Sequence, residues 1–195
     1  MTAALARPDP PVHLVVMGVS GSGKTTVALA LVDVLGWPYA EADDLHPQAN
    51  VDKMAAGHPL TDEDRGPWLH ALADWAAAGH AEGDSTVTTC SALRRAYRDV
   101  LRRGAPGTVH VHLTGDKHEL LGRLQGRAHF FPPELLESQL DTLEPLGADE
   151  DGVTVDVGRP VADVVADVLL VLDRTGHRPG ADRADTQRHR PYDTE

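Results

Sequence analysis

The sequence predicts an α/β domain with a five-stranded parallel sheet and helices on both faces. Apolar, strand-like runs alternate along the chain with segments of helical periodicity. The first of these runs is followed at once by a glycine-rich loop and then by a helix. Repeated strand-then-helix units favour a parallel sheet with right-handed crossovers. With 195 residues, the chain can bury about 70% of its unfolded surface in one core.

The elements follow from local patterns taken in order along the chain. VHLVVMG is a continuous apolar run of the kind that a buried parallel strand shows, and the helix after it ends at Gly36. Pro47 opens a later helix and Gly57 closes it. We expect strands at 12–18, 37–42, 85–89, 108–114 and 152–158. We expect helices at 25–36, 47–57, 67–79, 91–104, 116–125, 133–143 and 160–172.

The ends of the chain differ in composition from the segment between them. Residues 1–11 carry three prolines, and residues 173–195 are polar with little to bury, so both are expected to be disordered tails. The folded domain is therefore placed at 12–172, with a small mobile lid expected at about 123–133.

Composition restricts the classes of partner. Thirty acidic residues against 18 basic ones give a formal net charge of −12, which disfavours nucleic acid and anionic membranes. The single cysteine, Cys90, cannot form an internal disulfide, and no apolar run is long enough to span a bilayer. The eleven histidines show no metal-ligand spacing. We therefore expect a cytoplasmic protein that acts on small molecules.

One loop carries a specific signal. Gly18, Gly21, Gly23, Lys24 and Thr25 fit the pattern G-x-x-x-x-G-K-[ST], between a predicted strand and a predicted helix. Backbone N–H groups of such a loop surround phosphates, the lysine reaches the β- and γ-phosphates, and the Thr hydroxyl binds Mg²⁺. The sequence thus predicts a P-loop NTPase fold that binds ATP and Mg²⁺. The nucleotide-binding residues are expected to be Gly18, Ser20, Gly21, Ser22, Gly23, Lys24, Thr25 and Thr26.

A P-loop alone does not select among GTPases, motor ATPases and small-molecule kinases. A GTPase is expected to carry N-K-x-D, which does not occur, and the third predicted strand ends in TTCSA rather than in a metal-binding Asp. Asp43 and Asp44 instead follow the second strand, where small P-loop kinases approach their acceptor. These observations favour a small-molecule kinase.

Three further segments carry a resemblance to a family. EADDLHPQANVDKMAAGHPLTDEDRGPWL (41–69), TCSALRRAYRDVLR (89–102) and RAHFFPPELLESQLDTLEP (127–145) stand in order along the chain. Together they resemble the gluconokinases of the short P-loop type, which are related to shikimate and nucleoside monophosphate kinases. The resemblance covers roughly residues 12 to 172. It implies ATP-dependent phosphorylation of D-gluconate to 6-phosphogluconate by a protein that commonly dimerises.

The residues suit such an acceptor on their own terms. A polyhydroxy acid offers almost no apolar surface, so it must be held by directed hydrogen bonds to polar and charged groups. We expect Asp43 to take the proton of the acceptor hydroxyl, with Asp44 as the second candidate or as a helix cap. The other polar candidates in this segment are His46, Asn50, Lys53 and Arg65.

Two later segments complete the expected site. The resemblance places Ser91, Arg94 and Arg98 by the sugar acid, and the family often has Lys at position 94. It also places lid arginines at Arg123 and Arg127, which would meet the γ-phosphate and act in catalysis. The family usually reads R-K-G-H-F where this chain has RAHF, one residue shorter. The remaining candidates for closing on the acid are His129, Gln139 and, more weakly, Ser138.

Two rival functions stay open. A sibling kinase would bind ATP through the same P-loop but phosphorylate shikimate, another sugar acid or a nucleoside monophosphate. A catalytically inactive sensor would bind ATP without transfer. Its sequence signature would be loss of Lys24, Asp43 or the lid arginines, all of which are present.

Overall fold

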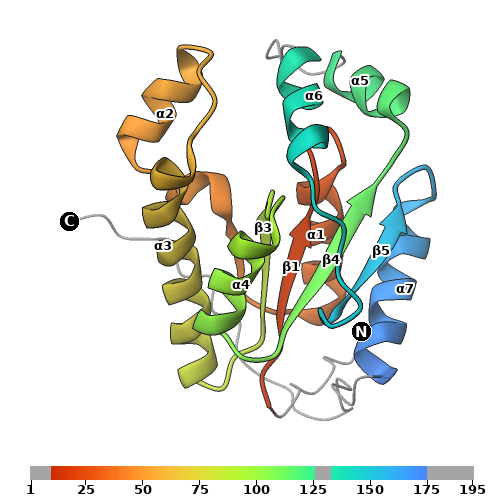
Figure 1. Cartoon of the computed structure of the whole chain (residues 1–195). Coiled ribbons are helices and arrows are strands. Elements are labelled where there is room, and N and C mark those ends of the chain that lie inside the picture. The colour runs from red at the N-terminus through yellow and green to blue at the C-terminus, as the bar shows by residue number, and fades with distance from the viewer. Residues whose placement is uncertain (1–9, 126–132, 175–195) are drawn as a thin grey trace.

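The computed structural model describes residues 10–125 and 133–174, and they form a sheet of five strands flanked by helices (Figure 1). The strands are β1 (His13–Met17), β2 (Tyr39–Glu41), β3 (Thr86–Cys90), β4 (Thr108–Thr114) and β5 (Gly152–Asp156). All pairs are parallel, and the strand order is β2-β3-β1-β4-β5. The predicted P-loop NTPase fold is confirmed.

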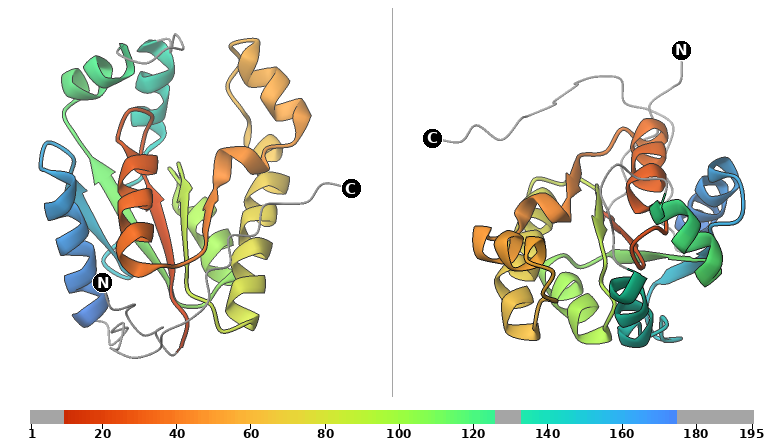
Figure 2. Two further views of the ribbon diagram at one scale, coloured as in Figure 1. Left: turned by 180° about the vertical axis from the view of Figure 1, so that it is seen from behind. Right: turned by 90° about the horizontal axis from the view of Figure 1, so that it is seen from above.

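Helices connect the strands and cover both faces of the sheet. They are α1 (Lys24–Leu35), α2 (Gln48–Ala55), α3 (Asp62–Ala81), α4 (Arg95–Gly104), α5 (Lys117–Gln125), α6 (Pro133–Thr142) and α7 (Val161–Arg174), with a short 3₁₀ helix η1 (Ala42–Leu45) after β2. Seen from above, α1 and α7 lie on one side of the sheet and α3 and α4 on the other (Figure 2). Above the strand ends, α2 stands on one side and α5 and α6 on the other (Figure 1).

Two apolar clusters fill the space between the sheet and these layers. The larger joins Leu14, Val16 and Val111 of the sheet to α1, α5 and α7. The smaller joins Val15 and Met17 to α3 and α4. Adjacent residues of β1 therefore point to opposite cores, as the alternation of a strand requires. Both cores leave the carboxyl ends of the strands for the connecting loops.

Two helices begin elsewhere than the sequence pattern predicts. The helix expected to open at Pro67 begins at Asp62, because Thr61 caps it in a box with Asp64, and Pro67 lies inside it. The helix expected from residue 91 begins only at Arg95, because Ala92 adopts φ 43° and the chain is still extended at residue 94. Residues 173 and 174, predicted as tail, are helical in α7.

Several predictions fall on residues that the structure does not describe. They are most of the two tails and the central part of the expected lid, residues 126–132. Among the described helices, none combines the length and the apolar character needed to cross a membrane.

Candidate active site

The P-loop joins β1 to α1 at the carboxyl end of the central strand. A Cβ atom at Gly18, whose φ is 138°, would lie 2.5 Å from the carbonyl oxygen of Leu113. At Gly21, with φ 83°, a Cβ atom would lie 2.9 Å from the carbonyl oxygen of Leu120. Only glycine fits either position, since both the backbone conformation and the neighbouring backbone exclude a side chain. The close approach of β4 and α5 therefore requires glycine at these two positions of the loop.

The start of α1 is open to an anion. Its N-cap is Gly23, and the helix has neither a side-chain cap nor an acidic residue in its first turn among the described residues. Backbone N–H groups at such a helix start, together with the helix dipole, bind phosphate. Lys24 Nζ donates to the carbonyl oxygen of Val19 at 3.2 Å, and the buried Ser22 Oγ has no hydrogen-bond partner among the described residues. The loop thus holds polar groups suited to a ligand.

Glu41, the last residue of β2, links the P-loop to the neighbouring strands. Its carboxylate accepts hydrogen bonds from Thr25 Oγ1 at 2.9 Å, from Tyr39 Oη at 2.6 Å and from Thr89 Oγ1. Burial and the bond to Glu41 raise the pKa of Tyr39, so its phenol stays a donor. The expected metal ligand Thr25 therefore has a carboxylate partner, which places two oxygen ligands of the kind that Mg²⁺ takes side by side.

Cys90 is the last residue of β3. Cys90 is buried there, and burial raises the pKa of its thiol to about 12. Three smaller effects on that pKa come from the charges of Asp43, Lys24 and Arg65. The charges of a carboxylate after β2, of the P-loop lysine and of an arginine of α3 therefore all act at the end of β3. The thiol itself, protonated and buried, is packing rather than a nucleophile.

The segment after β2 is held mainly by α3. His46 stacks on Trp68 with ring centroids 4.2 Å apart, and Trp68 Nε1 donates to the carbonyl oxygen of Ala42 at 2.6 Å. Asp43 and Asp44 lie exposed in η1, and neither caps α2, whose N-cap is Pro47 without a side-chain hydrogen bond. The exposed carboxylates thus have no capping role at α2.

The polar residues of α2 turn toward the start of α3. Asn50 Nδ2 donates to the carbonyl oxygen of Asp64 at 2.8 Å, and Lys53 Nζ pairs with the Asp64 carboxylate at 2.5 Å. Lys53, followed by the bonds from Thr61, lowers the pKa of Asp64 to about 2. Asn50 and Lys53, two predicted substrate ligands, thus bind Asp64 of α3 and connect α2 to α3 through polar contacts.

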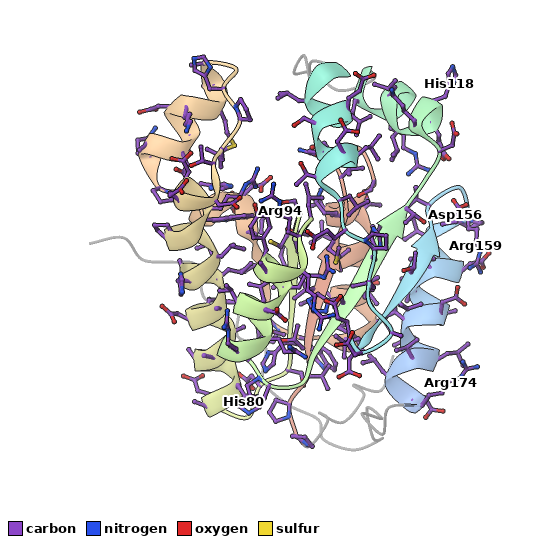
Figure 3. All side chains as sticks on the ribbon, in the orientation of Figure 1. His80, Arg94, His118, Asp156, Arg159 and Arg174 are labelled. Carbon is purple, nitrogen blue, oxygen red and sulfur yellow. The ribbon has the colours of Figure 1, made fainter. Side chains whose placement is uncertain are left out.

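Two arginines converge on one aromatic ring at the start of α4. The guanidinium carbon of Arg65 lies 5.7 Å from the ring centroid of Tyr97, and that of Arg94 lies 5.9 Å from it. Asp62 accepts from Arg94 at 2.7 Å and from the Tyr97 hydroxyl at 2.5 Å. Figure 3 shows Arg94 at the upper end of α4, toward the strand ends. The structure thus brings Arg65 and Arg94, two of the predicted substrate ligands, together at one ring.

Arg98 does not belong to this group, which corrects the prediction made for it. Its side chain is 1% exposed and pairs with Glu150, whose side chain is 4% exposed. The remaining guanidinium donors reach backbone carbonyls, those of Ala92, Leu93, Glu144 and Pro145. Every N–H of the guanidinium is therefore used inside the protein, and Arg98 is a structural connection between α4 and the segment before β5.

Arg123 lies on the other side of the P-loop. Its guanidinium donates to Glu119 at 2.6 Å and to the carbonyl oxygen of Val157 at 2.7 Å, and it approaches Gly23. It borders a cavity of about 110 Å³ beside the start of α1. The cavity is lined by Ser22, Gly23, Thr26, Val27, Arg123, Val157, Arg159, Val161 and Val164. Arg127 and His129 lie outside the described residues.

Gln139 and Ser91 contact the P-loop itself. The side-chain oxygen of Gln139, on α6, accepts from the N–H of Ser20 at 2.7 Å. The carbonyl oxygen of Ser91 accepts from the N–H of Gly18 at 3.3 Å. Gln139 was expected near the sugar acid, and the structure places it against the P-loop. Ser91, which follows β3, contacts the same loop through its backbone.

Comparison with known proteins agrees with this arrangement. The family described as "AAA domain" matches residues 14–146. A gluconokinase of Gluconobacter oxydans is 50% identical over 82% of this chain and 90% of its own length, and the thermoresistant gluconokinase of Escherichia coli is 43% identical over 82% and 93%. The chain belongs to the gluconokinase family. A crystal structure of a gluconokinase from Sinorhizobium meliloti has a TM-score of 0.75 at 44% identity, covering 86% of this chain and 94% of that one.

Within this gluconokinase fold, some residues at the site were missed by sequence reasoning. Glu41 had a signal, since it is a carboxylate at the end of the second strand, but the Asp pair two residues later drew the assignment. Tyr97 and Asp62 had none, because their contact spans 35 residues. Arg159 was hidden in the same way, as it reaches the P-loop region only through the packing of α7 on α1.

Proposed function

We propose that this protein transfers the γ-phosphoryl group of ATP to the terminal hydroxyl of D-gluconate, forming 6-phosphogluconate and ADP. The observation that carries the proposal is the presence of both an open P-loop, with Lys24 at the uncapped start of α1, and a pair of arginines, Arg65 and Arg94, that meet at the ring of Tyr97. A phosphate-binding lysine, the exposed carboxylate of Asp43 and an arginine with no ion pair among the described residues are the groups that a donor phosphate, an acceptor hydroxyl and an acceptor carboxylate need. Family membership supports the choice of gluconate.

In this proposal, Asp43 orients the acceptor hydroxyl and receives its proton. The hydroxyl oxygen then bonds to the γ-phosphorus as the bond to the β–γ bridging oxygen breaks, and ADP leaves with that electron pair. Lys24 exchanges its bond to the Val19 carbonyl for the phosphate oxygens. Because α1 has an open N-terminus, developing negative charge on the phosphates meets fixed N–H dipoles.

Thr25 and Glu41 would hold Mg²⁺. Their oxygen atoms lie 2.9 Å apart, one in the first turn of α1 and the other at the end of β2, and hydroxyl and carboxylate oxygens are hard ligands of the kind that Mg²⁺ prefers. Bound there, the ion would neutralise charge on the β- and γ-phosphates. Tyr39 and Thr89 fix the carboxylate of Glu41 for that task.

The adenine base would occupy the cavity beside Arg123. Its wall includes four valines, and it adjoins Gly23 of the P-loop, which is the side from which a nucleotide extends. A guanidinium plane stacks well on an aromatic ring, and Arg123 and Arg159 both border this cavity. Arg123 would therefore bind the base while remaining close to the phosphate loop.

An acceptor panel tests the proposal. D-gluconate, shikimate and AMP are offered with ATP and Mg²⁺, and ADP release is followed with a coupled assay. We expect gluconate to exceed the others by a large factor, because a site built to bond hydroxyls rejects analogues that leave its polar groups unpaired. Equal rates with shikimate or AMP would indicate a sibling kinase. ATP binding without gluconate-dependent ADP release would indicate a sensor.

We also propose a homodimer in the cytoplasm. Resemblance to the family supports both expectations. Size-exclusion chromatography with light scattering on the full chain tests the first, with a mass near 20.9 kDa contradicting it. Fractionation of expressing cells tests the second.

A further inference from the structure

We propose that Tyr97 and Asp62 are positioning residues that fix Arg65 and Arg94 as a receptor for the acceptor's carboxylate. The inference rests on the proposed function, because it concerns how that site recognises its substrate. In this inference, the ring of Tyr97 and the carboxylate of Asp62 cause the enzyme to prefer a monoanionic sugar acid over a neutral polyol. Neither group would touch the phosphates.

The geometry starts from the ring. Both guanidinium groups lie within 6 Å of the Tyr97 centroid, at 5.7 Å and 5.9 Å, although they come from different elements. Two like charges repel each other at this range, and the electron-rich face of a ring is a surface that accepts both. Tyr97 is 6% exposed and packed with Leu101 and Trp68 in the smaller core, so the ring is a fixed reference point.

Asp62 sets the charge. It binds Arg94 and the Tyr97 hydroxyl at once, through its two carboxylate oxygens. Burial and the bond to Asp62 raise the pKa of Tyr97, so the phenol remains a neutral donor. The cluster therefore holds two positive charges and one negative charge, which leaves a net charge of +1. That excess matches one carboxylate.

The position of Arg65 connects this cluster to the reacting end of the site. Its guanidinium lies over the Tyr97 ring, and its charge adds a small contribution to the lowering of the pKa of His46, the residue after η1, which burial chiefly causes. No ion pair to Arg65 is present within residues 10–125 and 133–174. A carboxylate bound at Arg65 would therefore direct the remaining carbon chain along η1, where Asp43 stands. Loss of the ring would free Arg65 to turn to solvent and would leave Arg94 held by Asp62 alone.

The test compares a charged acceptor with a neutral one of the same shape. D-Gluconamide replaces the carboxylate by an amide and serves as a competitive inhibitor against D-gluconate. We measure the KM of gluconate, the Ki of gluconamide, the KM of ATP and the thermal midpoint. The variants are Tyr97→Leu, which removes the ring, and Tyr97→Phe, which keeps the ring and removes only the bond to Asp62. The control is Arg95→Gln. Arg95 lies on the same helix as Tyr97, and its substitution breaks only an exposed ion pair with Asp149, a residue before β5.

We expect Tyr97→Leu to raise the KM of gluconate about tenfold and Tyr97→Phe to raise it about threefold. The Ki of gluconamide and the KM of ATP should stay within about twofold, as should all values for Arg95→Gln. If the KM of gluconate and the Ki of gluconamide rise together, the ring is only structural and the proposal is wrong. An unchanged KM in both Tyr97 variants also overturns it. A wild-type enzyme that fails to phosphorylate gluconate refutes instead the proposed function, and this inference with it.

Discussion

The two faces of the sheet are built from different chemistry. On the side of α1 and α7, strand positions such as Leu14, Val16 and Val111 form an apolar core. On the side of α3 and α4, the register aligns His13 with Thr86, and His110 beside Val15. His110 and His112 are buried with ring nitrogens that have no hydrogen-bond partner among the described residues, and Arg98 and Glu150 form a buried ion pair close by. One face is held by apolar burial and the other partly by charge.

This difference corresponds to the two halves of the site. The nucleotide half consists largely of backbone, with glycines in a loop and an uncapped helix start, carried on the apolar face. The acceptor half consists of side chains on α2, α3 and α4, carried on the polar face. Apolar burial does not respond to pH, whereas buried histidines and ion pairs do. The acceptor half should therefore be the more sensitive to pH and to single side-chain changes.

The largest expected effect is at Asp43, the exposed carboxylate of η1 that we propose as the proton acceptor. Asp43→Asn should lower kcat by about 10²–10⁴-fold with little change in either KM, because the amide binds a hydroxyl but cannot take its proton. Steady-state ADP release with gluconate measures it, and Asp44→Asn serves as the control with near wild-type turnover. Full activity in Asp43→Asn would remove this carboxylate from the reaction and leave Asp44 as the candidate.

The next effect concerns the charged scaffold below the acceptor half. Arg98→Met leaves Glu150 buried without its partner, so the free energy of unfolding should fall by about 3–5 kcal/mol, measured by urea denaturation. Turnover and the KM of gluconate at a temperature well below the midpoint should not change. A double variant that adds Glu150→Gln should recover part of the loss. A raised KM with unchanged stability would instead return Arg98 to the substrate site.

The fold could be predicted from sequence because its signals are local. Strand β4 and helix α5 fall where periodicity places them, and the P-loop is identified by residues adjacent in the chain. The first residues of some helices were harder to predict from the sequence. The box of Thr61 and Asp64 was readable but competed with Pro67, whereas the left-handed backbone of Ala92 has no signature in its residue type.

The candidate site could be predicted in its residue types but not in its pairings. Sequence selected Arg94 and Arg98 as equals on one helix face, yet one binds Asp62 at the rim and the other is buried with Glu150. Which acidic residue meets which arginine depends on how α4 packs on α3 and on the segment before β5. Pairing between residues far apart in the chain leaves no signal in the local sequence pattern. For the same reason, Tyr97 could not be predicted as part of the site.

A third, smaller effect is a dependence of stability on pH. Burial lowers the pKa of His110 to about 4, and burial followed by the charge of His80 lowers that of His13 to about 4. In the unfolded chain both would titrate near 6.5, so between about pH 6.5 and 4 the unfolded state binds more protons. The stabilisation is complete above pH 6.5 and is lost as the pH falls toward 4, by at most about 3 kcal/mol per histidine.

Urea denaturation at several pH values measures this effect. His110→Gln should flatten the pH dependence of the unfolding free energy between pH 6.5 and 4, whatever its effect on the absolute value. His70→Gln, on the exposed surface of α3, should leave the slope unchanged. An unaltered slope in His110→Gln would mean that the polar face does not carry the pH response, which would break the comparison of the two faces.

The smallest effect sharpens the boundary between the halves. Glu41 belongs to β2, on the acceptor side of the strand order, yet it binds Thr25 of α1. If it serves the nucleotide half, Glu41→Gln should raise the half-saturating Mg²⁺ concentration about tenfold while kcat at saturating Mg²⁺ and the KM of gluconate change little. Tyr39→Phe, which removes only one of the bonds to that carboxylate, should give a smaller shift in the same direction. A raised KM of gluconate with an unchanged Mg²⁺ requirement would assign Glu41 to the acceptor half instead. The boundary between the two halves would then lie between Glu41 and Thr25.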